Sequence, residues 1–348
     1  MLVMSRLGRL GILWLFAAGT GVLAFAEPLK RFQFSQVEMA VPIKLVFYAT
    51  DDQSANGAAK AVFDRFRQLN RILSDYDPDS ELNRLCRSAG TGAAIPVSEE
   101  LWTVLTVAQQ IAQQSEGAFD VTVGPVVRLW RRARRQKELP PPSLLADARQ
   151  LVGFRLLELV SDRRAVILLK PGMRLDLGGI AKGFAIDEGL LVLRRHRIGR
   201  AMIYAGGDIG LGDPPPDRPG WTVGVGLLDA DGPPTHTLCL SNCCVATSGD
   251  MWQFVVIDGI RYSHIVDPRT GLGLTDRCSV TVVGPEGIRA DALATAVAVL
   301  GPEKGLKLID AIPATAALVI RSSAGVVQTS RSSHWKTLRT APVGPEVR

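Results

Sequence analysis

The sequence predicts an α+β fold in which two packed lobes combine mixed sheet and helices. Two long stretches have apolar residues at helical spacing, several short apolar segments favour strands, and helices and strands do not alternate regularly. The chain has 348 residues, of which 47% are apolar and 21% are charged. That length and composition can bury a full core, and they exclude a disordered chain.

The first 26 residues are typical of a cleaved secretory signal. Arg6 and Arg9 precede an apolar run that ends in Ala-Phe-Ala at residues 24–26, the small-x-small pattern of a cleavage point. The run is interrupted by glycines and is short for a bilayer span of roughly 20 residues, so an uncleaved anchor is the alternative. We therefore divide the chain into a signal peptide at 1–26, a domain at 27–335 and a loop-like tail at 336–348.

The mature domain is predicted to begin with a strand and two helices. The segment "MAVPIKLVFYAT" at 39–50 favours a strand that enters a sheet. Apolar residues recur at helical spacing over 57–77, and Ser98 fits the N-cap position of a second helix over 97–117. After Gly117, residues 119–125 form a strand-like run that Gly124 and Pro125 close.

Short apolar segments farther along the chain favour strands of a second sheet. They are "AVILL" at 165–169, "AMIYAGG" at 201–207, "WTVGVGLL" at 221–228 and "FVVID" at 254–258. Proline-rich stretches at 139–143 and 213–220 interrupt the chain. A last apolar stripe over 288–301 predicts a helix.

Charge and cysteine content exclude several classes of function. The formal charge is +6, which becomes +4 without the two signal arginines, and much of it lies in "RLWRRARRQK" at 128–137. An exported chain seldom meets nucleic acid, so we expect this run to be a solvated helix face and expect no nucleic-acid partner. The five cysteines lack the spacing of a zinc site, and catalytic cysteine chemistry is not expected.

Two stretches have the residue types of a phosphate site and a metal site. In "RLDLGGIAKGFAID" two glycines lead into a helix whose first turn holds Lys182, so free N–H groups and a positive charge face an anion. A purely structural helix start is the alternative. Asp291 and Thr295 are four residues apart on one helix face and offer oxygen ligands of the kind Mg²⁺ prefers. The alternative is Asp291 as a helix cap, with Thr295 bonding back to its helix.

Two further stretches allow both a functional and a structural interpretation. Phe119 and Asp120 could stack on and bond a flat heterocycle, or could form a corner between a helix and a strand. In "SHIVDPRTG" the residues after His264 make a turn that would hold this histidine at a strand end. A lone histidine is more often structural than catalytic, so both interpretations of His264 stay open.

Seven stretches, in their order along the chain and their residues, resemble the FAD:protein FMN transferase (ApbE) family. They are "LSDYDPDSEL", "GAFDVTVGP", "DLGGIAKGFAID", "YAGGDI", "ATSGD", "HIVDPRTG" and "ADALATAVAVLG". The resemblance runs from about Met39 to the 320s. It implies an enzyme that splits FAD with Mg²⁺ and attaches FMN through a phosphoester to a threonine or serine of an exported flavoprotein.

The implied acceptors are subunits of membrane redox complexes. The signal-like start of the chain indicates a periplasmic or cell-envelope location, and association with the inner-membrane surface is compatible with it. Position by position, the resemblance implies FAD contacts at nine residues: Met39, Tyr76, Ala118, Phe119, Asp120, Asp176, Lys182, His264 and Ile265. It implies metal ligands at Gly179, through its backbone carbonyl, and at Asp291 and Thr295.

The sequence departs from the family pattern in three places. Cys86 stands where the family commonly has asparagine, and the arginine-rich region 131–142 and the "PPPDRP" loop match no family motif. We expect neither of these two regions to touch the implied site positions, and either could set the choice of partner.

The implied chemistry needs charge stabilisation and a base. The metal site and the helix start at Lys182 would stabilise cleavage of the pyrophosphate. His264 is the first candidate for the base because an ordinary histidine pKa lies near neutral pH, and Asp291 is the second. Two alternative functions remain: an FAD pyrophosphatase that releases FMN and AMP, and a non-enzymatic flavin-binding protein of the envelope.

We predict that the mature chain begins at Glu27 and lies outside the cytoplasmic membrane, because the segment before it has the form of a secretory signal. Mass spectrometry of the envelope fraction measures this N-terminus. An intact Met1 start on a soluble cytosolic form would contradict the prediction.

Overall fold

The computed structural model describes residues 28–226, 228, 232–251, 253–323 and 325–341, so the predicted signal peptide lies outside the described residues. Its main sheet has eight strands in the order β1-β2-β6-β7-β10-β15-β16-β17. These strands are β1 Lys30–Glu38, β2 Val41–Ala49, β6 Ala201–Ala205, β7 Asp208–Leu211, β10 Cys243–Gly249, β15 Arg277–Gly284, β16 Ala316–Ser323 and β17 Val326–Arg331. Within the described residues no helix has both the length and the apolar character needed to cross a bilayer.

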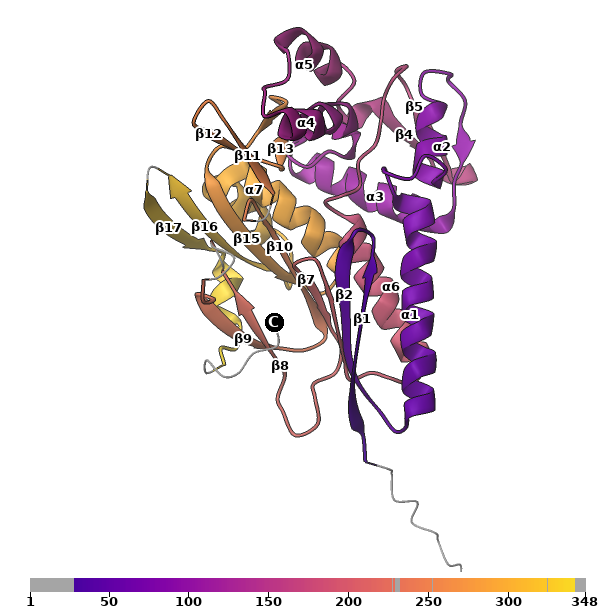
Figure 1. Ribbon diagram of the computed structural model, residues 1–348, viewed down its shortest axis with the longest axis vertical. Coiled ribbons are helices and arrows are strands. Elements are labelled where there is room, and N and C mark those ends of the chain that lie inside the picture. Colours follow the sequence, from indigo (N-terminus) through magenta and orange to yellow (C-terminus); the bar gives the residue numbers. More distant parts are fainter. Residues whose placement is uncertain (1–27, 227, 229–231, 252, 324, 342–348) are drawn as a thin grey trace, which may run out of the picture.

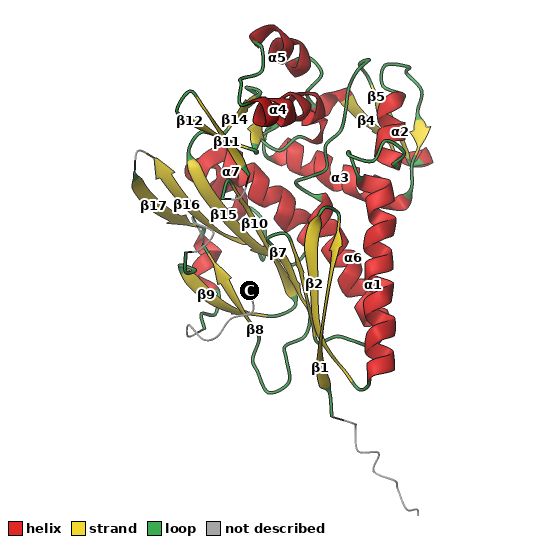
Figure 2. Cartoon of the chain, viewed as in Figure 1, coloured by secondary structure: helices red, strands yellow, loops and turns green. Residues whose placement is uncertain are grey.

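Three long helices cover one face of the main sheet (Figures 1 and 2). They are α1 Asp52–Leu73, α6 Ala181–Arg195 and α7 Gly287–Asp310, the last of which kinks at Gly301. Side chains alternate between the faces of a strand, so Leu45 packs into the helix-covered core while Val46 packs on the opposite side. There it meets Trp221 in the hairpin of β8 Trp221–Val225 and β9 His236–Leu240.

The helices α6 and α7 touch through their backbones. A Cβ atom on Gly183 would lie 2.1 Å from the carbonyl oxygen of Gly287, so a larger residue at this crossing would force the helices apart. The carboxylate of Asp187 on α6 accepts hydrogen bonds from the N–H groups of Gly287 at 2.8 Å and Ile288 at 2.9 Å. This carboxylate therefore caps the start of α7 and fixes the two helices against each other.

The second lobe is built from short helices and a small sheet. Its helices are α2 Glu81–Arg87, α3 Glu99–Gln114, α4 Gly124–Gln136 and α5 Pro142–Arg149. Its sheet has the order β3-β5-β4, from β3 Ile95–Pro96, β4 Leu157–Val160 and β5 Ala165–Leu168. One apolar cluster contains both Leu45 of the main sheet and Val166 of this small sheet, so the two lobes share a core.

Two small hairpins lie next to α4 (Figure 2). They are β11 Phe254–Ile257 with β12 Ile260–Ser263, and β13 Val266–Asp267 with β14 Leu272–Gly273. Short 3₁₀ turns complete the described chain at Val121–Val123, Phe154–Leu156, Ser161–Arg163 and Ser333–Thr337. Every strand pairing in the described residues is antiparallel, which confirms the α+β class.

The predicted helices are confirmed, with shifted ends. The first begins at Asp52, five residues earlier than predicted, because Asp51 accepts a hydrogen bond from the Ser54 N–H and caps it. Ser98 caps the second helix by accepting from the Leu101 N–H at 3.2 Å. The stripe over 288–301 is part of α7.

The predicted second sheet is wrong. The four segments assigned to it fall in four separate sheets as β5, β6, β8 and β11, and β6 pairs with β2 in the main sheet. Apolar content indicates that a segment is buried but does not identify its partner. The strand β1 at the sheet edge also lies outside the predicted segments, although Phe32 and Phe34 alternate with polar residues along it, which is the pattern of a half-buried strand.

Two other predicted segments need correction. The strand-like run 119–125 is a 3₁₀ turn that continues into α4, because Asp120 caps the turn by accepting from the Thr122 N–H at 2.8 Å. Part of the loop-like tail is paired with β9: the Cys239 N–H donates to the Arg339 carbonyl at 2.8 Å. The Ala341 N–H donates to the Thr237 carbonyl at 2.9 Å.

Candidate active site

Three charged side chains, two of them buried, form a cluster where α6, α7 and β7 meet. Lys182 Nζ lies 2.7 Å from Asp208 Oδ2 and 3.3 Å from both carboxylate oxygens of Asp291. The two carboxylate side chains are each 3% exposed. We call Lys182, Asp208 and Asp291 the lysine–aspartate cluster.

Electrostatics within this cluster keep the lysine charged. Burial alone would lower the pKa of Lys182, but the charges of Asp208 and Asp291 outweigh it and raise the pKa. Burial and the negative charge of Asp291 raise the pKa of Asp208, against the opposing charge of Lys182. One ammonium thus faces two carboxylates, so the cluster can accept further positive charge.

The structure excludes Asp291 as the cap of its own helix. It lies in the second turn of α7, whose first N–H groups are bound by Asp187. Asp291 Oδ2 instead accepts a hydrogen bond from the Gly183 N–H at 3.1 Å, across the helix crossing. Its carboxylate is therefore held at the site by α6 and not by its own backbone.

The other two predicted metal ligands lie beside Asp291. Thr295 is one turn farther along α7, and its Oγ1 lies 3.1 Å from Ser248 Oγ. A Cβ atom on Gly179 would crowd Thr295 Oγ1 at 3.0 Å, so the glycine lets the backbone approach this hydroxyl. A carboxylate, a hydroxyl and a backbone carbonyl are all oxygen donors of the kind that Mg²⁺ prefers.

The residues at this place fit a divalent cation. The ammonium of Lys182 already lies against Asp291, which shows that the position favours positive charge. No group of three or more His, Cys, Asp or Glu side chains placed to hold a metal occurs in the described part of the chain. A cation here would therefore need phosphate or water to complete its ligands.

Asp176 and Tyr76 are joined by an arginine that the sequence did not indicate. Arg131 Nη2 lies 2.8 Å from Asp176 Oδ2, and Arg131 Nη1 forms an ion pair with Asp75. The guanidinium carbon lies 4.1 Å from the centre of the Tyr76 ring. The expectation that the arginine-rich region would not touch the site positions is therefore wrong for Arg131.

Three other arginines of the run agree with a solvated helix face. Arg128, Arg132 and Arg135 of α4 are exposed, whereas the Arg131 side chain is 19% exposed. Arg131 directly follows the buried residue Trp130, and the helical period places the Arg131 side chain on the face of α4 that is turned to the site. Arg134, three residues after Arg131, is also partly buried, and its Nη1 donates to Gln253 Oε1 at 3.2 Å. The arginine-rich segment thus contains two different environments.

The remaining predicted FAD contacts differ in how deeply their side chains are buried. Met39 lies in the turn between β1 and β2, with φ of 50°. The Phe119 ring lies 3.4 Å from where a Cβ on Gly179 would be, so it is next to the predicted metal position. Ala118 and Ile265 are buried in the apolar core.

One carboxylate oxygen of Asp120 stabilises the local turn. Its Oδ1 accepts from the Thr122 N–H at 2.8 Å and from the Thr122 hydroxyl at 2.7 Å. Burial raises the pKa of Asp120, and these hydrogen bonds oppose the rise. Within the described residues, no hydrogen bond links Met39, Ala118, Asp120 or Ile265 to the lysine–aspartate cluster.

His264 lies at a strand end, as predicted. It directly follows β12, and the Gly271 N–H closes the next turn by donating to the Asp267 carbonyl at 2.8 Å. His264 Nδ1 lies 3.1 Å from the carbonyl oxygen of Gln253, which can only accept, so Nδ1 carries the proton. This tautomer leaves the lone pair on Nε2.

The pKa of His264 differs from the sequence expectation. Burial lowers this pKa to about 4, the charges of Arg134 and Lys182 add to the effect, and the Gln253 carbonyl opposes it. The expected pKa near neutral pH is therefore wrong. The imidazole is therefore neutral at ordinary working pH, with the Nε2 lone pair free, but its low pKa makes it a weaker base than an ordinary histidine.

Sequence reasoning missed three polar residues of the site. Asp208 follows a two-glycine turn within "YAGGDI" and Ser248 lies within "ATSGD", so both stood in stretches of family resemblance. A carboxylate that directly follows a glycine turn and starts an apolar strand could have indicated Asp208. Arg131 gave no signal that separates it from the other arginines of the segment 128–137.

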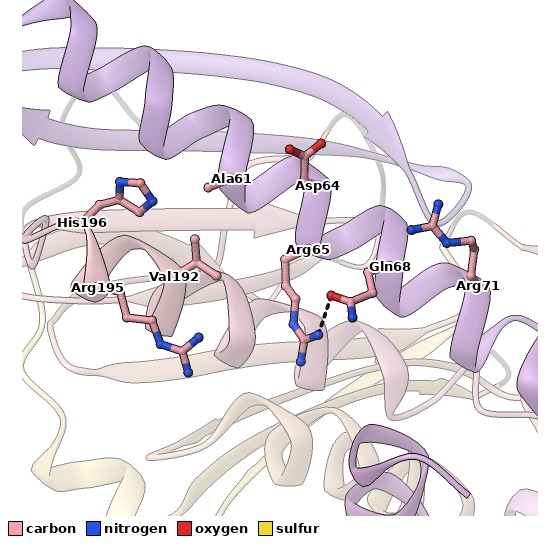
Figure 3. A pocket seen from close by; sticks show the side chains of 8 residues that line it. All are labelled: Ala61, Asp64, Arg65, Gln68, Arg71, Val192, Arg195 and His196. Atoms are coloured by element: carbon pink, nitrogen blue, oxygen red, sulfur yellow. Dashed lines mark hydrogen bonds between the residues drawn. The ribbon is translucent and has the colours of Figure 1, made fainter.

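An open cavity of about 580 Å³ lies away from this site, between α1 and α6 (Figure 3). Its lining residues include Arg65, Arg71 and His196, and none of the predicted site residues. Arg65 is ion-paired with Glu100 and Glu188. We therefore place the candidate active site at the lysine–aspartate cluster and not in this cavity.

The chain is similar to known proteins over most of its length. The ApbE family profile matches residues 39–319. The FAD:protein FMN transferase of Treponema pallidum is 33% identical over 345 residues, covering 93% of this chain and 95% of the relative. The flavin transferase ApbE from Vibrio cholerae is similar in structure, with a TM-score of 0.80 and 28% identity, covering 89% of this chain and 100% of that one. The flavinyl transferase ApbE of Pseudomonas stutzeri has a TM-score of 0.79 and 26% identity, covering 90% of this chain and 98% of that one.

We predict that His264 stays neutral and protonated on Nδ1 until the pH falls to about 4. Long-range ¹H–¹⁵N NMR of the FAD-free protein measures both properties, with His196, His236 and His334 as internal references. The folded state resists a proton that the unfolded chain accepts near pH 6.5, so this residue lowers the free energy of unfolding as the pH falls from about 6.5 to 4. A His264 pKa near 6.5, or a proton on Nε2, would contradict the geometry.

Proposed function

The chain belongs to the ApbE family of FAD:protein FMN transferases, and we propose that it cleaves FAD with a divalent cation and attaches FMN to an exported flavoprotein. The proposed attachment is a phosphoester to a threonine or serine. The observation that carries the proposal is the lysine–aspartate cluster, with Thr295 and Gly179 beside it. It offers oxygen ligands and a fixed positive charge next to a helix start.

Asp291, Thr295 and the carbonyl of Gly179 would hold the cation. When bound, a divalent cation supplies positive charge that stabilises the phosphates during transfer. Lys182 would keep Asp208 as its partner and remain charged beside the phosphates. The N-terminus of α6 adds the partial positive charge of a helix start at the same place.

His264 is the proposed base for the acceptor hydroxyl. Its Nδ1–H is fixed on the Gln253 carbonyl, and its neutral state leaves Nε2 able to take the hydroxyl proton. Asp291 is the less suitable base, because its carboxylate already accepts hydrogen bonds from the Gly183 N–H and the Lys182 ammonium. The tautomer of His264 supports this order of the two candidates.

The acceptor and the location belong to the same proposal. A secretory signal would bring the mature chain to the periplasm or cell envelope, where exported flavoprotein subunits of membrane redox complexes are its proposed substrates. Association with the inner-membrane surface would bring enzyme and acceptor together.

Incubation with FAD, Mg²⁺ and a candidate acceptor, followed by in-gel flavin fluorescence and nucleotide analysis, tests the activity. A fluorescent acceptor with AMP released supports transfer, whereas free FMN without a labelled acceptor indicates an FAD pyrophosphatase, and unchanged FAD indicates binding alone.

We predict that chelation stops transfer, that added Mg²⁺ restores it, and that Asp291→Ala lowers the transfer rate by about 100-fold or more. The fold should survive, because Lys182 keeps Asp208 as its partner. Single-turnover transfer and thermal unfolding are measured on the same samples.

Glu303→Ala is the matched control, since Glu303 lies on the same helix and its side chain is 85% exposed. It should leave the rate within twofold of the unmodified chain. Full activity of Asp291→Ala, or of the enzyme in excess chelator, would remove the cation from the proposed mechanism.

A further inference from the structure

We propose that Arg131 is a positioning residue for FAD, which holds the contact surface formed by Tyr76 and Asp176 and offsets its negative charge. The inference rests on the proposed function, because it takes Tyr76 and Asp176 as FAD contacts. It assigns a binding role to a residue from the arginine-rich segment, which matches no family motif.

Arg131 joins three segments that lie far apart in the sequence. It lies on α4, while Asp75 and Tyr76 follow α1 and Asp176 precedes α6. One guanidinium nitrogen binds Asp75, another lies 2.8 Å from Asp176 Oδ2, and the guanidinium carbon lies 4.1 Å from the Tyr76 ring centre. A planar fork can make these contacts together, whereas an ammonium of similar reach cannot.

Charge explains why this surface needs the arginine. The side chains of Asp75 and Asp176 are 17% and 10% exposed, so their repulsion is only partly screened by water. Burial and the charge of Asp75 raise the pKa of Asp176, and Arg131 opposes that rise. Without Arg131, the two carboxylates would lose the guanidinium that contacts both of them, and Arg134, which acts on Asp176 through its charge, would remain. They would then face an incoming ligand whose pyrophosphate is itself anionic.

Arg131 also holds the ring of Tyr76 from one side. Tyr76 as a whole residue is 71% exposed although Arg131 lies over one face of its ring, which leaves the opposite face for a ligand. An aromatic ring fixed from one side can stack a flat heterocycle on the other with little loss of conformational freedom. Removing the guanidinium would leave this loop residue free to rotate.

The same helix also contacts the segment that carries His264. Trp130 Nε1–H donates to the Gly271 carbonyl at 2.8 Å, in the turn that follows His264. Adjacent residues of α4 thus contact the Asp176 loop and the His264 turn. Because Arg131 contacts Tyr76 and Asp176 but not the proposed base His264, its loss should affect FAD binding more than the rate of the bound complex.

The test is a flavin-fluorescence titration of FAD with the full-length mature protein and its variants, without acceptor. Arg131→Ala should weaken FAD binding by about tenfold or more and raise the KM for FAD with a smaller change in kcat. Arg131→Lys should recover part of the affinity, because it restores the charge but not the fork. Adding Asp75→Asn to Arg131→Ala should also recover part of it, because one repelling charge is removed.

Arg132→Ala is the matched control. Arg132 is the next residue of α4, is exposed, and contacts Gln136 of its own helix. It should leave FAD affinity within twofold. Thermal unfolding of every variant separates a binding role from a structural one, and if Arg131→Ala does not fold, the Arg131→Lys variant provides the comparison.

The outcomes separate this inference from the proposed function. If the unmodified protein binds no FAD, the proposed function fails and the role of Arg131 fails with it. If that protein binds FAD and a folded Arg131→Ala binds it equally well, only the role of Arg131 is overturned. If Arg131→Ala does not fold, equal affinity of Arg131→Lys overturns the role of the guanidinium. A lower melting temperature with unchanged affinity would likewise show that Arg131 is merely structural.

Discussion

The backbone contact between α6 and α7 is the constraint on which the site depends. Gly183 and Gly287 lack side chains where the helices cross, and Asp187 binds the start of α7 across the same contact. That crossing brings Lys182 within 3.3 Å of Asp291, although the two residues are 109 positions apart. Any side chain between the helices would separate the two charges and open a cluster that is stable only when its charges are paired.

A second constraint comes from α4, which links the two sides of the candidate site. Trp130 contacts the turn after His264, and Arg131 contacts the loops of Tyr76 and Asp176. The neighbouring arginines 128, 132 and 135 are exposed on the same helix. The helical period, and not composition, decides which arginine has a role in the site.

The sequence predicted the local parts of this arrangement better than the long-range ones. Asp291 and Thr295 share a helix face and Lys182 lies in the first turn of a helix, as their spacing indicated, because both features depend only on neighbouring residues. Asp208 and Arg131 were missed because each acts through partners far away in the chain. The four strands assigned to one sheet failed for the same reason, since apolar content does not specify which strands pair. The neutral state of His264 also required the fold, because burial and the charges of Arg134 and Lys182 set its pKa.

We propose that Asp291, Thr295 and Gly179 hold a divalent cation while Lys182 remains paired with Asp208. Anomalous diffraction from crystals grown with FAD and Mn²⁺ locates such a cation. We expect one manganese peak bounded by the Asp291 carboxylate, the Thr295 hydroxyl and the Gly179 carbonyl, with Lys182 on Asp208. A peak remote from these three residues, or an ordered FAD with Lys182 still against Asp291 and no manganese between them, would contradict it.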